Sequence, residues 1–407
     1  MSDTAHPSIH GPVDADVQWF GASQRMIGGQ PDSRYGWLER GGAVYIVKAI
    51  SPDLTAYAAT LLAHERQMLA RLQQLKAPAP EVLDVGRADW LVTRFAGLSL
   101  QRLTHASDLQ GASPLERFGF AERLAAWVYL LRRLQPMADA GVLAIDLYSA
   151  NVVLPLTHVT QGQLRLHEAA MIDHAHTLEA GMNMRRPVWI NHDMERIAPE
   201  LKGAMRADMA RLKAAFDNVG ARLPGYSRLP GDLDAFSRRV WAEYDAPQQL
   251  QQLLDSGNLD ANCAMQFAAG MALKHLAPLA ESSQQRHTLE GVLQRMTAMD
   301  ASARFKKLSH AADALEAVVQ ALPLVSAHSF APLQPQDLTL REDPAPPPNP
   351  EPPSRKPVEV PTIRAIVSVP PSPPPAPRLP PLPMRWLFVA LALGLAWGTR
   401  WPLSWGG

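Results

Sequence analysis

A proline-rich stretch divides this chain of 407 residues into a part that can build a core and a part that cannot. Residues 331–384 contain 20 of the 37 prolines, in runs such as PAPPPNPEPP and PPSPPPAP. Proline has a fixed φ and no amide donor, so such a segment favours an extended, polyproline-like conformation. We therefore expect residues 331–384 to be a disordered linker and the folded part to precede it.

An apolar segment follows the linker. Residues 386–399 carry no charge, but these 14 residues would span about 21 Å as a helix, against a hydrocarbon core of about 30 Å. Extension to Trp405 reaches about 30 Å and leaves Arg400 near an interface, where it can snorkel. We predict that residues 385–407 form one C-terminal transmembrane helix. A helix lying on the membrane surface, or docked on a partner, is the alternative.

The overall charge and the cysteine content limit the partners that we expect. Lys plus Arg and Asp plus Glu each number 39, so no net field favours nucleic acid, and we expect no nucleic-acid partner. Cys263 is the single cysteine, which excludes an internal disulfide and fits a reducing compartment. The first twenty residues lack the basic and apolar regions of a secretory signal peptide.

Hydrophobic periodicity predicts a β-rich first part and an α-rich second part. In chain order, the pattern predicts strands at 41–50, 81–87 and 89–95, helices at 55–75 and 114–140, a hairpin of 152–156 with 164–173, and mostly helix over 202–323. This order predicts two lobes with a cleft between them. The helical residues 251–323 could complete the second lobe or form a separate bundle.

Phosphoryl transfer needs a cation at the phosphates, a group that holds this cation, a group that orients the acceptor hydroxyl, and metal ligands. Lys48 ends the strand-like VYIVK, and Glu65 follows in a predicted helix that could bring its carboxylate to the ammonium. Asp146 and Asn151 share one short loop in GVLAIDLYSANVVL. Asp173 ends AAMID, at a strand terminus where a carboxylate can meet a metal.

In this order and spacing the motifs resemble the protein kinase superfamily over roughly residues 25 to 250. VYIVK resembles the strand with the phosphate-binding lysine, and HERQML the helix whose glutamate pairs with it. WLVTRFAGLSL resembles the hinge, AIDLYSAN the catalytic loop and IDHA the magnesium-binding segment. IAPEL resembles the end of the activation segment, and Asp208 the aspartate that supports the catalytic loop from below.

The resemblance implies an α+β, two-lobed protein-kinase-like fold with a small β-rich lobe and a large α-helical lobe. It implies a bacterial serine/threonine kinase that uses ATP and Mg²⁺ to phosphorylate protein hydroxyls. Lys48 would bind the α- and β-phosphates, and Glu65 would position Lys48. Asp146 would orient the acceptor hydroxyl, while Asn151 and Asp173 would hold the metal and, with Lys48, the nucleotide.

Several positions depart from the family pattern. Ala144, Ile145 and Tyr148 stand where the catalytic loop usually has His, Arg and Lys, and His174 and Ala175 replace Phe and Gly. No glycine-rich loop of the family's spacing precedes Lys48. Two alternatives therefore stay open: a catalytically weak or dead pseudokinase that scaffolds a bacterial envelope or secretion complex, and a small-molecule or lipopolysaccharide-type kinase.

The expected organisation follows from these segments. We expect an N-terminal extension at 1–24, a small lobe at 25–95, a large lobe at 96–250, its helical completion or an accessory region at 251–330, the linker at 331–384 and the anchor at 385–407. We expect a single-pass protein of the bacterial inner membrane with its globular part in the cytoplasm. Arg378 and Arg385 on the proximal flank of the anchor agree with that orientation.

Overall fold

The computed structural model describes most of the chain before the linker. The described residues are 16–19, 26–27, 30–31, 33–50, 55–104, 118–158, 162–181, 195–222, 239–240, 242–244, 248–319 and 321–330. The expected linker and anchor lie outside these residues. Among the helices of the described residues, none is long and apolar enough to cross a membrane.

A five-stranded antiparallel sheet begins the fold. Its order is β1 (Gln18–Trp19), β4 (Ser33–Arg40), β5 (Ala43–Ile50), β7 (Trp90–Arg94) and β6 (Val82–Leu83). Strand β5 lies in the centre, paired with β4 and β7, and it confirms the strand expected at 41–50. Gly41 and Gly42 form the tight turn between β4 and β5 at φ of 58° and 75°, a conformation that glycine adopts without strain.

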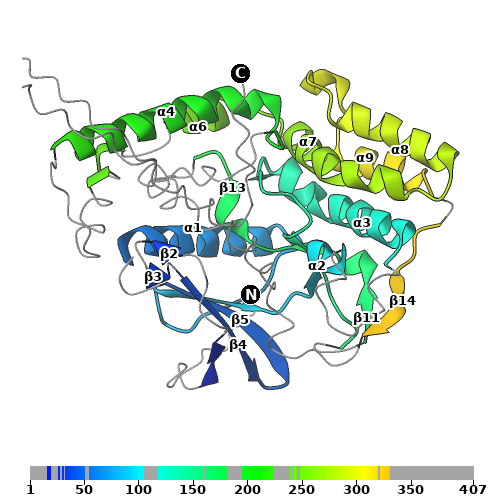
Figure 1. Cartoon of the computed structure of the whole chain (residues 1–407), viewed down its shortest axis with the longest axis horizontal. Coiled ribbons are helices and arrows are strands. Elements are labelled where there is room, and N and C mark those ends of the chain that lie inside the picture. The colour runs from blue at the N-terminus through cyan, green and yellow to red at the C-terminus, as the bar shows by residue number, and fades with distance from the viewer. Residues whose placement is uncertain are drawn as a thin grey trace, which may run out of the picture.

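Helix α1 (Thr55–Gln74) packs on the sheet with one side and on the helical part with the other. Leu62 and Leu69 form an apolar cluster with Leu91 of β7. Met68 and Leu72, on a different side of the helix, join the large core of the second part. Figure 1 shows α1 lying between the sheet and the remaining helices. The amphipathic pattern predicted this helix correctly, and the structure shows that both of its apolar sides are used.

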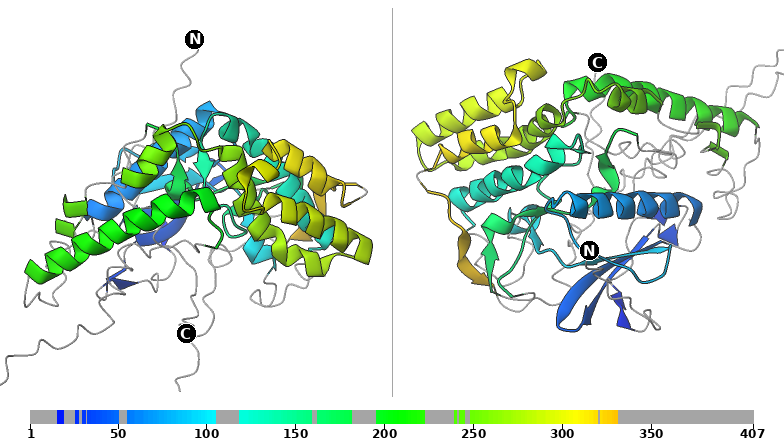
Figure 2. Two further views of the ribbon diagram at one scale, coloured as in Figure 1. Left: turned by 90° about the horizontal axis from the view of Figure 1, so that it is seen from above. Right: turned by 180° about the vertical axis from the view of Figure 1, so that it is seen from behind.

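The second part is built around α3 (Phe120–Asp139), which is buried along most of its length. Helices α7 (Ala261–Leu273), α8 (Ser283–Met296) and α9 (Leu308–Glu316) pack with α3 in one continuous hydrophobic core. Helices α4 (Pro199–Arg222) and α6 (Gln248–Asp255) lie beside each other at one side, as both views in Figure 2 show. The helical residues beyond 251 therefore share their core with α3.

Short strands link distant segments of the second part. Strands β12 (Ala170–Met171), β10 (Val152–Leu154) and β8 (Leu98–Ser99) form one small sheet, in that order, and α2 (Leu100–Thr104) follows β8. The pairing of β10 with β12 confirms part of the predicted hairpin. However, β11 (Gly162–Arg165) pairs with β14 (Val325–Phe330), which the sequence pattern did not predict. Pairing across such a separation leaves no local signal in the sequence.

Gly97 lies where the chain passes from the sheet to the second part, between β7 and β8. Its φ is +132°, and a Cβ placed there would lie 2.0 Å from the carbonyl oxygen of Leu154. This neighbour is backbone at the end of β10, where Leu154 is paired with Leu98, so it cannot move aside cheaply. The residue that joins the two parts must therefore be glycine.

We predict that Gly97→Ala lowers the free energy of unfolding by about 3 kcal/mol or more, because a backbone collision adds to the strained φ. Gly86→Ala is the matched control, since Gly86 also has a positive φ of 67° but a Cβ there meets no atom within 4 Å. That control is expected to cost only about 1–2 kcal/mol. Urea denaturation of both variants checks this, and equal losses would contradict the predicted collision.

Candidate functional site

Lys48 and Glu65 form a buried ion pair between the central strand and the neighbouring helix. The Nζ of Lys48, on β5, donates to Oε2 of Glu65, on α1, at 2.8 Å. The two side chains are only 12% and 7% exposed. Long side chains of opposite charge are held together here with little access to water, where a charge interaction is stronger than on the surface. The structure therefore brings together the first two residues that the sequence singled out.

The loop of residues 146–151 is tightly organised by its own hydrogen bonds. The amide nitrogen Nδ2 of Asn151 donates to Oδ2 of Asp146 at 2.9 Å and to its backbone carbonyl at 3.1 Å. Within the loop, the backbone N–H of Asn151 donates to the Tyr148 carbonyl at 2.9 Å. Buried residues flank the loop on both sides, at Ile145 and Val152, and fix it to the core. Asp146 and Asn151 thus act as one rigid unit.

Burial raises the pKa of Asp146 to about 7, although the hydrogen bond from Asn151 and the positive charge of Arg196 oppose this rise. A carboxyl group of this kind is held close to the point at which it can accept or release a proton near neutral pH. The elevated pKa is the expected result of placing a carboxyl group in a site with little solvent.

Asp173 lies two residues after the end of β12, in the left-handed conformation at φ 60° and ψ 74°. Its Oδ1 is shielded from solvent and has no hydrogen-bond partner among the described residues. Burial raises the pKa of Asp173 well above its usual range; Lys48 opposes this, whereas Glu65 and Asp146 add to it. These interactions place Asp173 within electrostatic range of three other candidate residues. The sequence-predicted site residues therefore converge in space.

The oxygen atoms of this site suit a hard cation. Oδ1 of Asp173 is an unpaired buried acceptor, and Asn151 uses its amide nitrogen on Asp146, which leaves its amide oxygen for a ligand. Within the described ranges no three His, Cys, Asp or Glu side chains converge to hold a metal. Magnesium is usually bound by one or two protein oxygen ligands together with water and substrate phosphates, so these residues fit it.

Two histidines, His64 and His174, tie the Asp173 segment to its surroundings. His174 Nε2 contacts the Met171 carbonyl at 3.0 Å, so this nitrogen carries the proton and Nδ1 accepts from the Thr177 hydroxyl at 3.1 Å. Burial lowers the pKa of His174 to about 4, which keeps the ring neutral. His64 of α1 donates from Nε2 to the Thr177 carbonyl at 2.9 Å.

A short strand pair completes this brace. Strand β13 (Thr177–Leu178) pairs with β9 (Leu143–Ala144), immediately before the catalytic-loop candidate. Arg71 of α1 also forms an ion pair with Glu179 at 2.9 Å. The helix that carries Glu65 is therefore fastened to the segment that follows Asp173. Nothing in the local sequence distinguishes these contacts from ordinary surface contacts.

The connection between β1 and β4 is the place where a phosphate-binding loop is expected from the resemblance. A phosphate-covering loop would lie in the connection between β1 and β4, because β4 leads directly into the strand with Lys48. This connection contains the short pair β2 (Met26–Ile27) and β3 (Gln30–Pro31). Residues 28–29, both glycines, lie outside the described residues.

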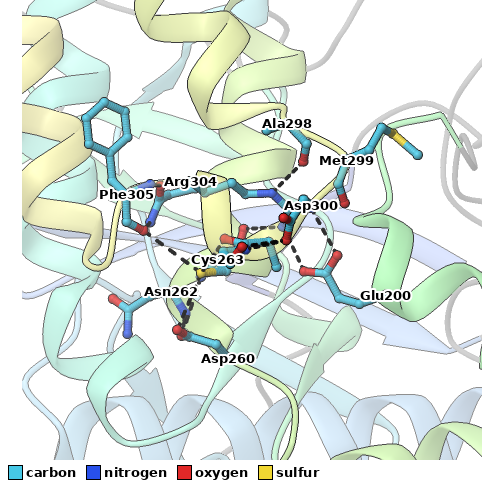
Figure 3. Close-up of polar contacts among 12 residues, drawn as sticks. Glu200, Asp260, Asn262, Cys263, Ala298, Met299, Asp300, Arg304 and Phe305 are labelled. Atoms are coloured by element: carbon cyan, nitrogen blue, oxygen red, sulfur yellow. Dashed lines mark hydrogen bonds and ion pairs between the residues drawn. The ribbon is translucent and has the colours of Figure 1, made fainter.

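Arg304 anchors residues 198–200, where α4 begins. Its guanidinium pairs with Glu200 through Nη1 at 2.7 Å and Nη2 at 3.1 Å, and Nη1 also donates to the carbonyl of Cys263 at 2.9 Å. Figure 3 shows Arg304 extending from its loop toward Glu200 at the start of α4 and passing close to Cys263. Sequence reasoning identified Glu200 within Ala-Pro-Glu but missed its partner, which lies 104 residues further along the chain.

Asp208 has a different role from the one that the resemblance implied. Its carboxylate is fully buried and accepts the backbone N–H groups of Gln249 and Leu250, at 3.1 and 2.8 Å, and pairs with Arg211 at 3.2 Å. Among the described residues, its partners thus belong to α4 and to the N-terminus of α6, and none to the catalytic-loop candidate. A carboxylate is well placed at these unsatisfied donors and at the positive end of the helix dipole.

Comparisons with known proteins add a limited structural likeness. No protein-family model and no curated protein sequence matches the chain. The kinase domain of Mycobacterium tuberculosis PknI aligns at 16% identity and a TM-score of 0.39, covering 75% of this chain and 97% of that chain. A double mutant of the same domain aligns at 17% identity and a TM-score of 0.38, covering 78% and 99%.

A likeness of this size carries no functional argument. The five-stranded sheet, the helix paired to its central strand through Lys48 and Glu65, and the helical second part agree with the α+β arrangement, β-rich first and α-helical second, that the sequence predicted.

We predict that Arg304→Met destabilises the protein by about 3 kcal/mol or more, because Glu200 loses its partner and several carbonyls lose a donor. The control is Lys213→Met, which breaks the exposed pair with Asp217 and should cost less than about 1 kcal/mol. Urea denaturation measures both, and a loss for Arg304→Met no larger than the control would contradict a structural role for the pair.

Proposed function

We propose that this chain is an ATP-dependent protein kinase-like phosphotransferase, tethered to a bacterial membrane by residues 385–407. The observation that carries the proposal is the convergence on Asp173. Its shielded carboxylate lies within electrostatic range of Lys48, Glu65 and Asp146, which come from a strand, a helix and a loop far apart in the sequence. Lys48 compensates the charge of Glu65, but three buried carboxyl groups near one lysine are costly for stability, so their collection in one place favours a functional reason.

Each residue has a role that its contacts support. Lys48 would bind the α- and β-phosphates of ATP, and Glu65 would hold the ammonium in place through the 2.8 Å pair. The Asp146 carboxylate would orient the acceptor hydroxyl and accept its proton as the oxygen attacks the terminal phosphorus. Asn151 would keep that carboxylate in position through its amide hydrogen bond. The products are the phosphorylated hydroxyl and ADP.

Asn151 and Asp173 would hold Mg²⁺ through their side-chain oxygens. Bound magnesium would supply positive charge to the phosphate oxygens during transfer. Asp173 must be ionised for that role, and a cation at Oδ1 would lower its pKa from the raised value that burial imposes. The network of His174, Thr177 and His64 would keep the Asp173 segment against α1.

A pseudokinase scaffold is the second candidate function. The observation that favours it is Tyr148, which occupies the place of the catalytic-loop lysine and packs partly against the large core. Such a pseudokinase would bind nucleotide but transfer phosphate slowly or not at all. Its function would be to bind partners in an envelope or secretion complex through its surface.

The decisive experiment follows transfer of the terminal phosphate from labelled ATP with Mg²⁺ by the full chain in detergent, to itself, to a generic protein acceptor and to a small-molecule acceptor such as a lipopolysaccharide core sugar. We expect transfer to protein hydroxyls, reduced about 10²–10⁴-fold in Asp146→Asn, because the proton acceptor is lost. Asp173→Asn should show a similar loss together with weaker dependence on Mg²⁺.

Asp217→Asn is the matched control, because Asp217 is an exposed aspartate on α4 that pairs only with Lys213 among the described residues. It should leave transfer unchanged. Absence of transfer in the unaltered chain, with ATP binding intact, would favour the pseudokinase. Transfer confined to the small-molecule acceptor would replace the protein-kinase proposal with the third candidate.

The proposed tether has its own test. We expect the full chain to float with phospholipid vesicles in a density gradient and to resist extraction at alkaline pH, because about twenty residues of the tail can reach across the hydrocarbon core. A chain that ends at residue 384 is the control and should stay at the bottom of the gradient. Flotation that alkaline pH reverses would instead indicate a helix on the membrane surface.

A further inference from the structure

Arg196 lies beside the catalytic-loop candidate, although it belongs to a distant segment. Its guanidinium carbon is 5.6 Å from the centroid of the Tyr148 ring, within the range of a cation–π contact. The positive charge of Arg196 also acts on the Asp146 carboxylate. A cation thus lies next to the loop at which phosphate would be transferred, on the side where Tyr148 takes the place of a lysine.

The backbone around Arg196 is firmly held. Ile197 and Ala198 are 2% and 1% exposed and join the large core, and Glu200 is fixed by Arg304. Arg196 itself is half-buried, in contrast to the two buried residues that follow it. Tyr148 is fixed as well, because its N–H donates to the Asp146 carbonyl at 3.2 Å. The cation is therefore held near Asp146 by two anchored segments.

We propose that Arg196 supplies the positive charge at the terminal phosphate of ATP, in place of the lysine that Tyr148 replaces. The proposal rests on the proposed function of this site and names the residue that distinguishes ATP from ADP. Arginine suits this task because its planar guanidinium stays charged and matches two phosphate oxygens at once. The Tyr148 ring would hold the plane of the guanidinium and so limit its freedom before ATP binds.

The test compares the dissociation constants of ATP and ADP, each with Mg²⁺, by titration calorimetry on the full chain in detergent. We expect Arg196→Gln to weaken ATP binding about tenfold, because one charged contact to phosphate is lost, and to leave ADP binding unchanged. Arg196→Lys should keep part of the preference for ATP. Arg206→Gln, an exposed arginine on α4, is the matched control and should alter neither constant.

Charge rescue separates this role from a merely structural one. The double variant Arg196→Gln with Tyr148→Lys places a new cation two residues from Asp146 and should restore at least half of the lost preference for ATP. In the transfer assay, Arg196→Gln should raise the KM for ATP about tenfold, in line with the weaker binding, and lower kcat about 10²-fold, and the double variant should regain most of that rate.

The outcomes distinguish this proposal from the proposed function. An ATP preference that Arg196→Gln leaves unchanged overturns the role of Arg196, as does a preference that Tyr148→Lys fails to restore in a protein with unaltered thermal unfolding. A chain that prefers ATP through Arg196 but transfers no phosphate supports this inference and overturns the enzyme. A chain that binds neither nucleotide overturns both.

Discussion

The buried pair of Lys48 and Glu65 is the interaction on which the arrangement of this molecule depends. It fastens α1 to the central strand of the sheet at 2.8 Å, in a place with little water. The same helix is held on its other side by Met68 and Leu72 in the large core, and by His64 and Arg71 on the segment after Asp173. One helix thus sets the position of the sheet relative to the residues that would handle phosphate.

Two further side-chain interactions restrict the motion of the residues in the site. Asn151 holds Asp146 inside a short loop, and Arg304 holds Glu200 at the start of α4. Both use hydrogen bonds to carboxyl groups with limited access to water, where such bonds are stronger than on the open surface. Oδ1 of Asp173 has no protein partner among the described residues. The rigid surroundings therefore hold one unsatisfied buried acceptor where a cation would bind in the proposed function.

The structure shows which contacts are made by three residues that depart from the kinase sequence pattern, namely Ala144, His174 and Tyr148. The small Ala144 lies fully buried and pairs with Thr177 through the backbone, so the strand pair ties the start of this loop to the segment after Asp173. The neutral His174 takes a defined place through two hydrogen bonds in the segment where an apolar ring was expected. Tyr148, with Arg196 over its ring, is the departure with the most direct bearing on chemistry.

The sequence by itself determined the local elements and the candidate residues, because periodicity and motif spacing are local properties of the chain. It predicted the strand with Lys48, the helix with Glu65 and the loop with Asp146 and Asn151. Only the tertiary structure decided which distant groups meet: β14 on β11, Arg304 on Glu200, and Arg196 on Tyr148. It also showed that Asp208 binds the N-terminus of α6, whereas the resemblance implied that it supports the loop of Asp146 and Asn151. Such contacts form between segments far apart in the chain, where packing of the core brings them together and no local pattern records the pairing.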